Sequence, residues 1–205
     1  MKIISWNLLR LHGASLPEVA RLVERERPEA LFMQEATREI DRLPDLVGGF
    51  YARAPLPGRI HGLAIWTPKA TPAPPVVMAL PAGSIVLRVC QIVDFGPFCA
   101  ANVHLSHGQL LNRRQLRRIA AALPERAAIL GDFNLVGPVL LGGFHDVGPR
   151  HATHLMGDFL PLRLDRCLVR GLVCGTNAVL DRQKSDHRPI VVRLQVAAAS
   201  PRRVA

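Results

Sequence analysis

The segment AAILGDFN, residues 127–134, limits the possible folds of this chain more than any other segment. Its apolar run ends at a glycine, which is typical of a strand buried inside a sheet. An acid and an amide follow two residues apart, so continued strand alternation would direct Asp132 and Asn134 to one side, with Phe133 opposite. Burying polar side chains at the end of a strand costs free energy unless they bind a partner. The segment therefore predicts a core strand that ends at a functional site.

Strand-like runs outnumber helical patterns in the rest of the chain. Apolar runs bounded by turn residues predict strands over residues 2–9, 30–35, 62–66, 85–93, 97–105, 127–131, 162–169, 172–179 and 189–196. Amphipathic spacing predicts helices over residues 16–27 and 109–123, and a short one over 37–46. Residues 48–62 are predicted to be turn-rich, and the prolines of 67–75 predict a surface loop. This balance favours an α+β domain of two sheets over a doubly wound parallel sheet.

The length and apolar content indicate one domain with a substantial core. The chain has 205 residues, of which 49% are hydrophobic. We assign residues 1–196 to the domain and residues 197–205 to a basic, flexible tail. No apolar run is long enough to cross a bilayer, and Asn7 comes too early for the apolar region of a signal peptide. We therefore expect a soluble, cytoplasmic protein.

The cysteines show no metal-binding spacing. They are Cys90, Cys99, Cys167 and Cys174, which form no CxxC pair and lie in apolar, strand-like segments. Because thiols in such surroundings behave as small apolar side chains, we expect packed, reduced cysteines rather than a zinc site or disulfide bonds.

The excess of positive charge suggests an anionic partner. The formal net charge is +10, and it comes almost entirely from arginine. Nucleic acid, a phosphorylated small molecule or a membrane surface would fit this charge, although an arginine-rich composition can also reflect genome base composition. The helix predicted over 109–123 carries Arg113, Arg114, Arg117 and Arg118 on a shared surface. This surface either binds substrate phosphates, with Arg113 and Arg114 as the candidate contacts, or is a solvated helix face.

Polar side chains recur at the ends of the predicted strands. They are Asn7, Glu35, His104, Asp132, Asn134, Asp165, Asp186 and His187. Each alone has a structural explanation, such as a turn residue or a hydrogen-bonded histidine, but their recurrence is typical of a site on a rigid scaffold. The oxygen donors suit a hard divalent cation, Mg²⁺ or Mn²⁺, and the histidines suit proton transfer. With the basic surroundings, these groups predict phosphoryl-transfer chemistry.

Six motifs carry a resemblance to a known family. In chain order they are Ser5-Trp6-Asn7, Met33-Gln34-Glu35, Asn102-Val103-His104-Leu105, Gly131-Asp132-Phe133-Asn134, Leu164-Asp165-Arg166 and Ser185-Asp186-His187-Arg188-Pro189. Through this ordered set the chain resembles the endonuclease/exonuclease/phosphatase superfamily, the relatives of pancreatic deoxyribonuclease, from residue 3 to about 194. The resemblance implies a four-layer α/β/β/α sandwich of two mainly antiparallel sheets packed face to face. It also implies phosphoester hydrolysis that depends on Mg²⁺ or Mn²⁺.

The resemblance also implies which residues bind the metal and the substrate. The implied metal ligands are Glu35 as the principal one, Asn7, Asp132 and Asp186. The implied substrate contacts are Asn7, His104 and Asn134. Asp132 and Asn134 would hold the metal, the attacking water or the phosphate, and both belong to the implied catalytic set.

Proton transfer falls to two histidines under the same resemblance. His187 would act as general base on the attacking water, with Asp186 orienting its ring and Ser185 as a turn residue rather than a nucleophile. His104 would donate a hydrogen bond to the phosphate or the leaving oxygen, and Asp165 would orient one of the catalytic histidines, with His104 as the leading candidate.

Three positions depart from patterns in the family. Leu9 stands where the abasic-site repair branch carries Asp or Asn, and His104 stands where that branch carries tyrosine. Both departures favour the branch of deoxyribonucleases, sphingomyelinases and phosphatases. His154 stands near an aromatic position of relatives, and no second dedicated metal site is expected among His145, His151 and His154.

The predicted function is a Mg²⁺-dependent nuclease that hydrolyses DNA, with RNA as a further substrate, by in-line attack of water. Nucleic acid is the expected partner because the charge is positive and no aromatic-rich hairpin suggests membrane docking. Two alternatives stay open: hydrolysis of a small soluble phosphoester, and a catalytically silent nucleic-acid or protein binding module. We expect a monomer without an obligate protein partner.

Overall fold

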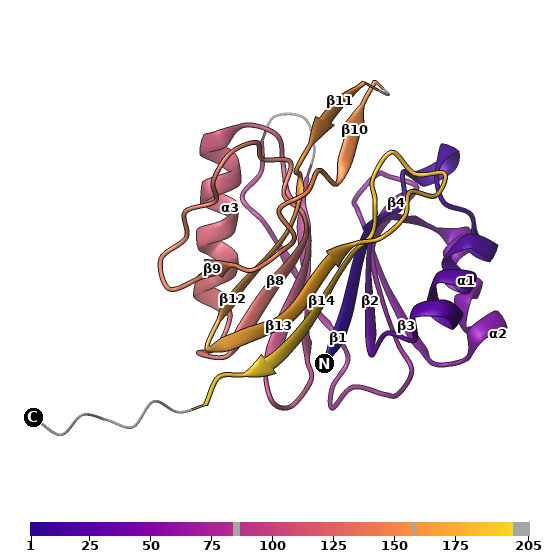
Figure 1. Cartoon of the computed structure of the whole chain (residues 1–205), viewed down its shortest axis with the longest axis horizontal. Helices are drawn as coiled ribbons and strands as arrows, with labels where there is room; N and C mark the ends of the chain where they lie inside the picture. The colour runs from indigo at the N-terminus through magenta and orange to yellow at the C-terminus, as the bar shows by residue number, and fades with distance from the viewer. Residues whose placement is uncertain (84–86, 158, 199–205) are drawn as a thin grey trace, which may run out of the picture.

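The computed structural model describes residues 1–83, 87–157 and 159–198. In this part of the chain, two six-stranded sheets pack face to face, and helices cover the outer face of each sheet (Figure 1). Each sheet contains one parallel pair of neighbouring strands among antiparallel ones. The predicted α/β/β/α sandwich is confirmed.

The first sheet has the strand order β13-β14-β1-β2-β4-β3. Its strands are β1 (Lys2–Asn7), β2 (Ala30–Thr37), β3 (Phe50–Pro55), β4 (His61–Thr67), β13 (Leu172–Val179) and β14 (Ile190–Val196). Its outer face carries α1 (Leu16–Glu26), α2 (Leu43–Val47) and the 3-10 turns Arg10–His12 and Arg38–Arg42. Helix α1 begins where the sequence predicts, because Ser15 and Glu18 form a reciprocal capping box at its start.

The second sheet has the strand order β5-β6-β7-β8-β12-β9. Its strands are β5 (Val76–Ala79), β6 (Val89–Asp94), β7 (Cys99–His104), β8 (Ala127–Asp132), β9 (His145–Asp146) and β12 (Asp165–Arg170). Helix α3 (Gln109–Ala122) covers its outer face. A separate hairpin of β10 (His154–Met156) and β11 (Leu160–Leu162) lies at one end of the sandwich.

The core has three apolar layers, one between the sheets and one beneath the helices on each side. On β1, Ile3 belongs to the layer between the sheets and Ile4 to the layer beneath α1. On β8, Leu130 belongs to the central layer, whereas Ile129, together with Phe133 directly after the strand, packs beneath α3. Because both faces of these strands are covered, their sequences are continuous apolar runs rather than alternating ones.

Several element boundaries differ from the prediction. The first strand ends at Asn7 rather than residue 9, because Leu9 adopts the left-handed region at φ 54°. The segment predicted to be turn-rich, 48–62, contains β3, an edge strand whose exposed side chains hide its strand character. The short helix predicted over 37–46 is a 3-10 turn followed by α2. Part of the strand predicted over 85–93 and most of the predicted tail (84–86 and 199–205) lie outside the described residues.

Two expectations from composition concern the cysteines and the membrane. All four cysteines are free, and Cys90 and Cys167 are buried, as predicted. Among the described residues, no helix combines the length and apolar character that spanning a membrane requires.

Candidate active site

The two sheets bring their polar strand ends together. At the end of β1, the Asn7 side-chain amide donates a hydrogen bond to Asp132 Oδ2 at the end of β8, with a distance of 3.0 Å. Strand β1 is parallel to β2 and β7 is parallel to β8, so the carboxyl ends of these four strands meet at one end of the sandwich. Polar residues that are far apart in sequence therefore face one another there.

Three predicted site residues lie in one row across the second sheet. The register pairs His104 of β7 with Asp132 of β8, and Asp132 with Asp165 of β12. Gly131 makes the close approach of β7 and β8 possible, because a Cβ atom there would lie 1.9 Å from the Val103 carbonyl oxygen. The glycine of the motif is thus a packing requirement, and the row places two carboxylates and an imidazole side by side.

Four polar groups surround the Asp132 carboxylate, which is only 1% exposed. Besides Asn7, the backbone N–H of Asn134 donates to Oδ1 at 2.8 Å. Oδ2 lies 3.4 Å from His104 Nε2 and 3.7 Å from His187 Nε2. Burial acts to raise the pKa of Asp132, but the two histidines and the hydrogen bonds outweigh burial and hold this pKa below its usual value. Asp132 is therefore charged at neutral pH.

Asp165 contacts His187 rather than His104, the histidine predicted as its leading partner. Asp165 Oδ2 lies 2.8 Å from His187 Nδ1, and the carboxylate is fully buried. Asp186, expected to orient His187, instead has its Oδ2 3.7 Å from Nδ1 of His154. Asp186 lies near the same histidine, since its ligand oxygen is within 4.8 Å of a His187 ring nitrogen, but the hydrogen bond to Nδ1 comes from Asp165 on the second sheet.

The two site histidines have opposite pKa shifts. Burial acts to lower the pKa of His187, but the carboxylates of Asp165 and Asp132 outweigh burial and raise the pKa to about 10. Burial dominates at His104 and, despite Asp132, lowers its pKa to about 3. In the metal-free protein at neutral pH, His187 therefore carries a proton on each ring nitrogen and His104 is neutral.

The loop that carries His187 is tied to the first strand. The Trp6 indole N–H donates to the His187 carbonyl at 3.0 Å. The Ser185 hydroxyl donates to the Asn7 carbonyl at 2.7 Å and accepts from the His187 backbone N–H at 3.1 Å. Ser185 is fully buried. Its hydrogen bonds agree with the prediction of a turn residue rather than a nucleophile.

Glu35 has an unusual backbone conformation within β2. The β2–β4 register shifts between Met33 and Ala36, and Glu35 has a φ of 55°, in the left-handed region. A bulge of this kind re-aims a side chain, and such strain is found at functional sites. Glu35 Oε2 is buried without a hydrogen-bond partner, and burial raises the pKa of the carboxyl group despite Arg10, whose Nε lies 4.0 Å away. A buried carboxylate oxygen that accepts no hydrogen bond and has only this long ion pair fits a hard divalent cation.

Asn134 does not continue the strand alternation that the sequence suggests. It adopts the left-handed region at φ 48°, and its side-chain amide donates to the Leu105 carbonyl at 3.0 Å. Its backbone N–H caps Asp132, as described above, so the chain turns directly after β8. Phe133 packs beneath α3, on the far side from the site, as predicted.

Sequence reasoning missed three residues near the site. Arg10 lies beside Glu35. Arg88 is buried, and its charge interacts electrostatically with the carboxylates of Glu35 and Asp132. A lone arginine within the apolar segment Ile85-Val86-Leu87-Arg88-Val89 is a signal that could have revealed the second of these. His154 forms a group with Asp186 and His187 whose potential ligand atoms lie within 4.8 Å of one another. This proximity was not expected, since the sequence assigned His154 to an aromatic position.

The predicted contacts Arg113 and Arg114 lie on the exposed surface of α3. Among the described residues, no hydrogen bond or ion pair joins them to the residues around Asp132. Their contact with substrate stays a prediction.

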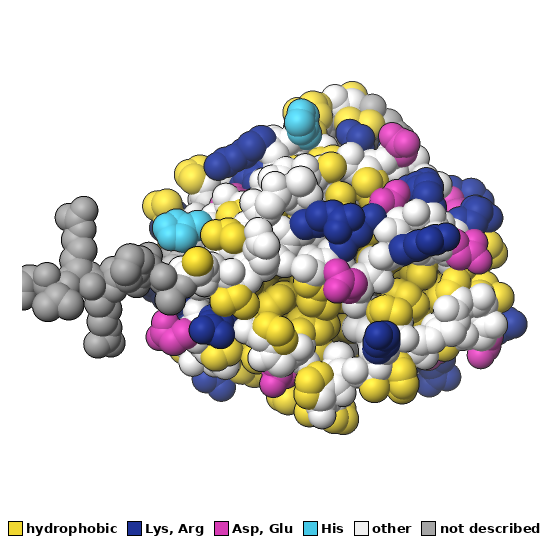
Figure 2. Space-filling view, turned by 60° about the horizontal axis from the view of Figure 1, so that its bottom comes forward, with side chains coloured by type: hydrophobic (Ala, Val, Ile, Leu, Met, Phe, Trp, Pro, Cys, Tyr) yellow, Lys and Arg dark blue, Asp and Glu magenta, His cyan; other side chains and the backbone are white. Residues whose placement is uncertain are grey.

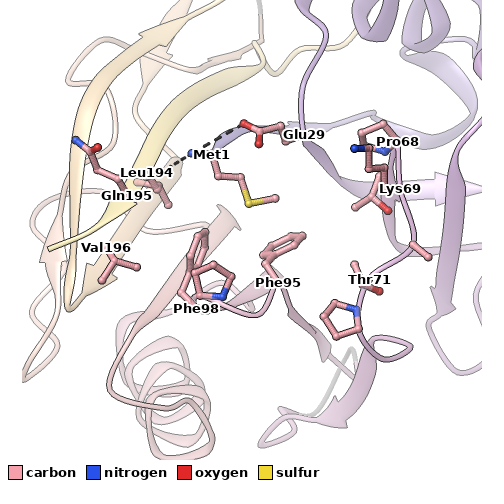
Figure 3. Close-up of a pocket in the computed structure, with 14 residues that line it drawn as sticks. Met1, Glu29, Pro68, Lys69, Thr71, Phe95, Phe98, Leu194, Gln195 and Val196 are labelled. Atoms are coloured by element: carbon pink, nitrogen blue, oxygen red, sulfur yellow. Dashed lines mark hydrogen bonds and ion pairs between the residues drawn. The ribbon is translucent and has the colours of Figure 1, made fainter.

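An apolar cavity of about 600 Å³ lies at the opposite end of the sandwich. Figure 2 shows apolar side chains gathered on that face, and Figure 3 shows Met1, Phe95 and Phe98 around the cavity. Phe95 and Phe98 flank the turn between β6 and β7, so they lie at the other end of β7 from His104. The cavity is separate from the candidate site.

The model of one protein family matches the chain over residues 4–187, and its description is Endonuclease/Exonuclease/phosphatase family. No curated protein sequence matches the chain.

Several solved structures share the fold. The endonuclease/exonuclease/phosphatase from Bacteroides vulgatus has a TM-score of 0.81 at 15% identity, covering 96% of this chain and 98% of that chain. The mannosyl-6-phosphatase Bt3783 of Bacteroides thetaiotaomicron has a TM-score of 0.77 at 18% identity, covering 95% and 99%. A D. rerio TDP2 humanized by 14 mutations has a TM-score of 0.73 at 19% identity, covering 96% and 99%. These likenesses concern the fold.

Proposed function

Because the chain belongs to the endonuclease/exonuclease/phosphatase family, we propose that it hydrolyses phosphodiester bonds of nucleic acid, DNA before RNA, with Mg²⁺ or Mn²⁺ as cofactor. Members of this family are phosphoester hydrolases, and so is this chain. What we propose beyond family membership is the substrate, the metal and the catalytic residues.

One arrangement carries the proposal: the imidazole of His187 held between the buried carboxylates of Asp165 and Asp132. Asp165 accepts from Nδ1, which fixes the ring and leaves Nε2 directed toward the end of β8. A histidine whose one nitrogen is fixed by a carboxylate is the usual form of a general base. A merely structural histidine has no need of a second carboxylate at its other nitrogen.

The buried Glu35 oxygen that accepts no hydrogen bond supports a metal site, which Glu35, Asn7 and Asp132 would form. Asp186, with a buried oxygen that also lacks a hydrogen-bond partner, is a further candidate ligand. When bound there, a divalent cation supplies positive charge that neutralises the carboxylates and phosphate oxygens and lowers the pKa of His187 toward neutrality.

In this proposal, each residue of the site has a distinct role in hydrolysis. Neutral His187 takes the proton of the attacking water at Nε2, and its Nδ1–H keeps its hydrogen bond to Asp165. His104 stays uncharged and supplies an N–H next to the phosphate, where it stabilises developing negative charge. Asn134 holds the Asp132 carboxylate through its backbone and offers its side-chain carbonyl to the substrate or water.

A second candidate substrate is a small soluble phosphoester. The likeness to a mannosyl-6-phosphatase over 95% of this chain favours it. The same residues would act, and only the groups that surround the phosphate would differ.

The test is a substrate panel: supercoiled plasmid, single-stranded DNA, RNA and sugar phosphates, each with Mg²⁺, Mn²⁺ or a chelator. We expect nicking of plasmid that disappears with the chelator and falls about 10²- to 10⁴-fold in His187→Ala. The matched control is His145→Ala, an exposed histidine on β9, which should nick normally.

Turnover of sugar phosphates with intact DNA would overturn the nuclease assignment in favour of the second candidate. DNA binding without turnover of any ester would favour a silent binding module.

We further predict that residues 1–196 form the catalytic domain and that the protein is a cytoplasmic monomer. The free cysteines agree with a reducing compartment.

A further inference from the structure

Arg88 is a buried cation whose Nε has no hydrogen-bond partner among the described residues. It directly precedes β6, and only 7% of the residue is exposed. Its Nε is buried without a hydrogen-bond acceptor, and among the described residues its guanidinium group forms no ion pair. Arginine has five N–H donors and stays charged in proteins, so burying it unpaired is costly.

The charge of Arg88 acts on the candidate active site. Arg88 lowers the pKa of His104, and the charges of Asp132 and Glu35 act in turn on Arg88 itself. Desolvation nevertheless outweighs these carboxylates, so the pKa of Arg88 is below its usual value. The two carboxylates thus stabilise the charge of Arg88 but do not compensate for its burial.

An anion that enters the site would supply the missing partner. A phosphoryl oxygen matches the planar fork of a guanidinium group, and hydrogen bonds between two charged groups are stronger than neutral ones. The antiparallel β6–β7 register pairs Cys90 with Val103, so Arg88, two residues before Cys90, lies beside the end of β7 that carries His104. This position puts a buried cation next to the strand ends that carry the metal-ligand candidates.

We propose that Arg88 binds a non-bridging oxygen of the substrate's phosphoryl group, with its Nε–H as one donor. This assignment rests on the proposed hydrolase function, because it names a further substrate contact of the same site. The alternative is that Arg88 only balances the charges of Glu35 and Asp132 without touching substrate.

The experiment measures binding of inorganic phosphate by calorimetry, with Mg²⁺ and with chelator. The proteins are wild type, Arg88→Met, Arg88→Lys and the control Arg21→Met, which removes an exposed charge from α1. We expect phosphate affinity to fall roughly 10- to 100-fold in Arg88→Met, less in Arg88→Lys, and not at all in the control. Unchanged affinity in Arg88→Met would overturn the proposal.

A thermal scan separates substrate contact from structural support. Without phosphate, Arg88→Met should melt no lower than wild type, since it removes an uncompensated buried charge. Phosphate should then raise the melting temperature of wild type and Arg21→Met but not of Arg88→Met. An equal rise in all three proteins would contradict the proposal.

If Arg88→Met does not fold, an experiment on the wild-type protein still tests the contact between Arg88 and phosphate. The Nε–H proton resonance of Arg88, assigned by its loss in Arg88→Lys, should move downfield on phosphate titration because it gains an acceptor. An unmoved resonance at saturating phosphate would refute the contact.

Two further arms keep this proposal distinguishable from the proposed function. Parallel titrations with a 5′-phosphorylated oligonucleotide and with a sugar phosphate show which phosphoryl source depends most on Arg88. Arg88-dependent phosphate binding in a protein that hydrolyses nothing would uphold Arg88 and refute the hydrolase, whereas normal hydrolysis of the active substrate by Arg88→Met would refute Arg88 alone.

Discussion

The two histidines of the candidate site share a residue type but not an electrostatic environment. His187 lies between two carboxylates, whereas His104 faces only Asp132 and also feels the positive charges of Arg88 and His187. Burial is the main cause that lowers the pKa of His104 to about 3, whereas the two carboxylates outweigh burial at His187 and raise its pKa to about 10. Titratable groups with opposed shifts in one site are typical of divided acid and base roles.

At this scale, the first prediction concerns Asp165 as a positioning residue for His187. Asp165→Asn removes the carboxylate that accepts from Nδ1 at 2.8 Å, so the ring loses its fixed tautomer and orientation. We expect kcat to fall about 10²- to 10⁴-fold with little change in phosphate affinity. Steady-state kinetics and calorimetry measure both quantities. Asp45→Asn on exposed α2 is the control, and an equal kcat for the two variants would contradict this role.

The second residue-scale prediction concerns the metal. Glu35→Gln keeps the shape of the side chain but removes its charge, so Mn²⁺ affinity should fall at least about 10-fold by calorimetry. The metal-free variant should melt no lower than wild type, because burial of this carboxylate is unfavourable and raises its pKa. Glu24→Gln, exposed on α1, should bind Mn²⁺ normally. Unaltered Mn²⁺ affinity in Glu35→Gln would remove Glu35 from the metal site.

Individual elements position these side chains through local backbone irregularities. The register shift in β2 re-aims Glu35, and the glycine at position 131 lets β8 approach β7.

Near β12, a cluster of charged side chains holds the segment that leads to Asp165. Asp146 of β9 accepts from Arg163 at 2.8 Å in two hydrogen bonds and from Arg166 at 3.1 Å.

A pH-dependent stability prediction follows for this element. Burial acts to raise the pKa of Asp146, but Arg163 and Arg166 outweigh it and hold the pKa below its usual value. The stabilisation is thus fully present above the unfolded-state pKa of about 3.9 and is lost as pH falls through the lower folded-state pKa. Asp146→Asn should reduce the free energy of unfolding by about 3 kcal/mol at pH 7.

Urea titrations at several pH values measure this difference. The gap between wild type and Asp146→Asn should narrow progressively below about pH 4. Asp45→Asn breaks an exposed pair with Arg42 and should cost under about 0.5 kcal/mol. A gap that stays constant down to pH 2 would show that the carboxylate charge does not provide the stabilisation.

Over the whole molecule, a buried polar side chain joins the two sheets. Asn102 of β7 is fully buried, and its amide donates to the carbonyls of Met33 and Ala64 in the facing sheet, at 3.1 and 3.0 Å. Its carbonyl accepts from Gln34 Nε2 at 2.8 Å. These bonds set the relative position of β2 and β7, whose ends carry Glu35 and His104.

We therefore predict that Asn102→Leu destabilises the protein strongly. The substitution removes three buried hydrogen bonds, one from Gln34 and two to the carbonyls of Met33 and Ala64, which should cost about 2–4 kcal/mol of unfolding free energy in urea titrations. Asn177→Leu, which removes an exposed hydrogen bond on β13, should cost under about 1 kcal/mol. A loss below about 1 kcal/mol in Asn102→Leu would show that the sheets do not depend on this link.

The sequence alone determined the features that depend on local periodicity. Continuous apolar runs identified β8 and its neighbours, because a strand covered on both faces needs apolar residues throughout. Polar residues directly after such runs identified Asn7, Glu35, His104 and Asp132 as one cluster, because strand ends converge at a sheet edge. The exposed edge strand β3 escaped prediction, since its side chains alternate only weakly between core and solvent.

Only the tertiary structure decided which of these groups touch. The pairing of Asp165 with His187 rather than His104 depends on the β8–β12 register and on the loop tied to Trp6 and Ser185. The burial of Arg88, directly before β6, likewise appears only in the folded chain. Contacts between residues about 20 or more positions apart follow from the register and packing of whole elements, which local sequence patterns do not encode.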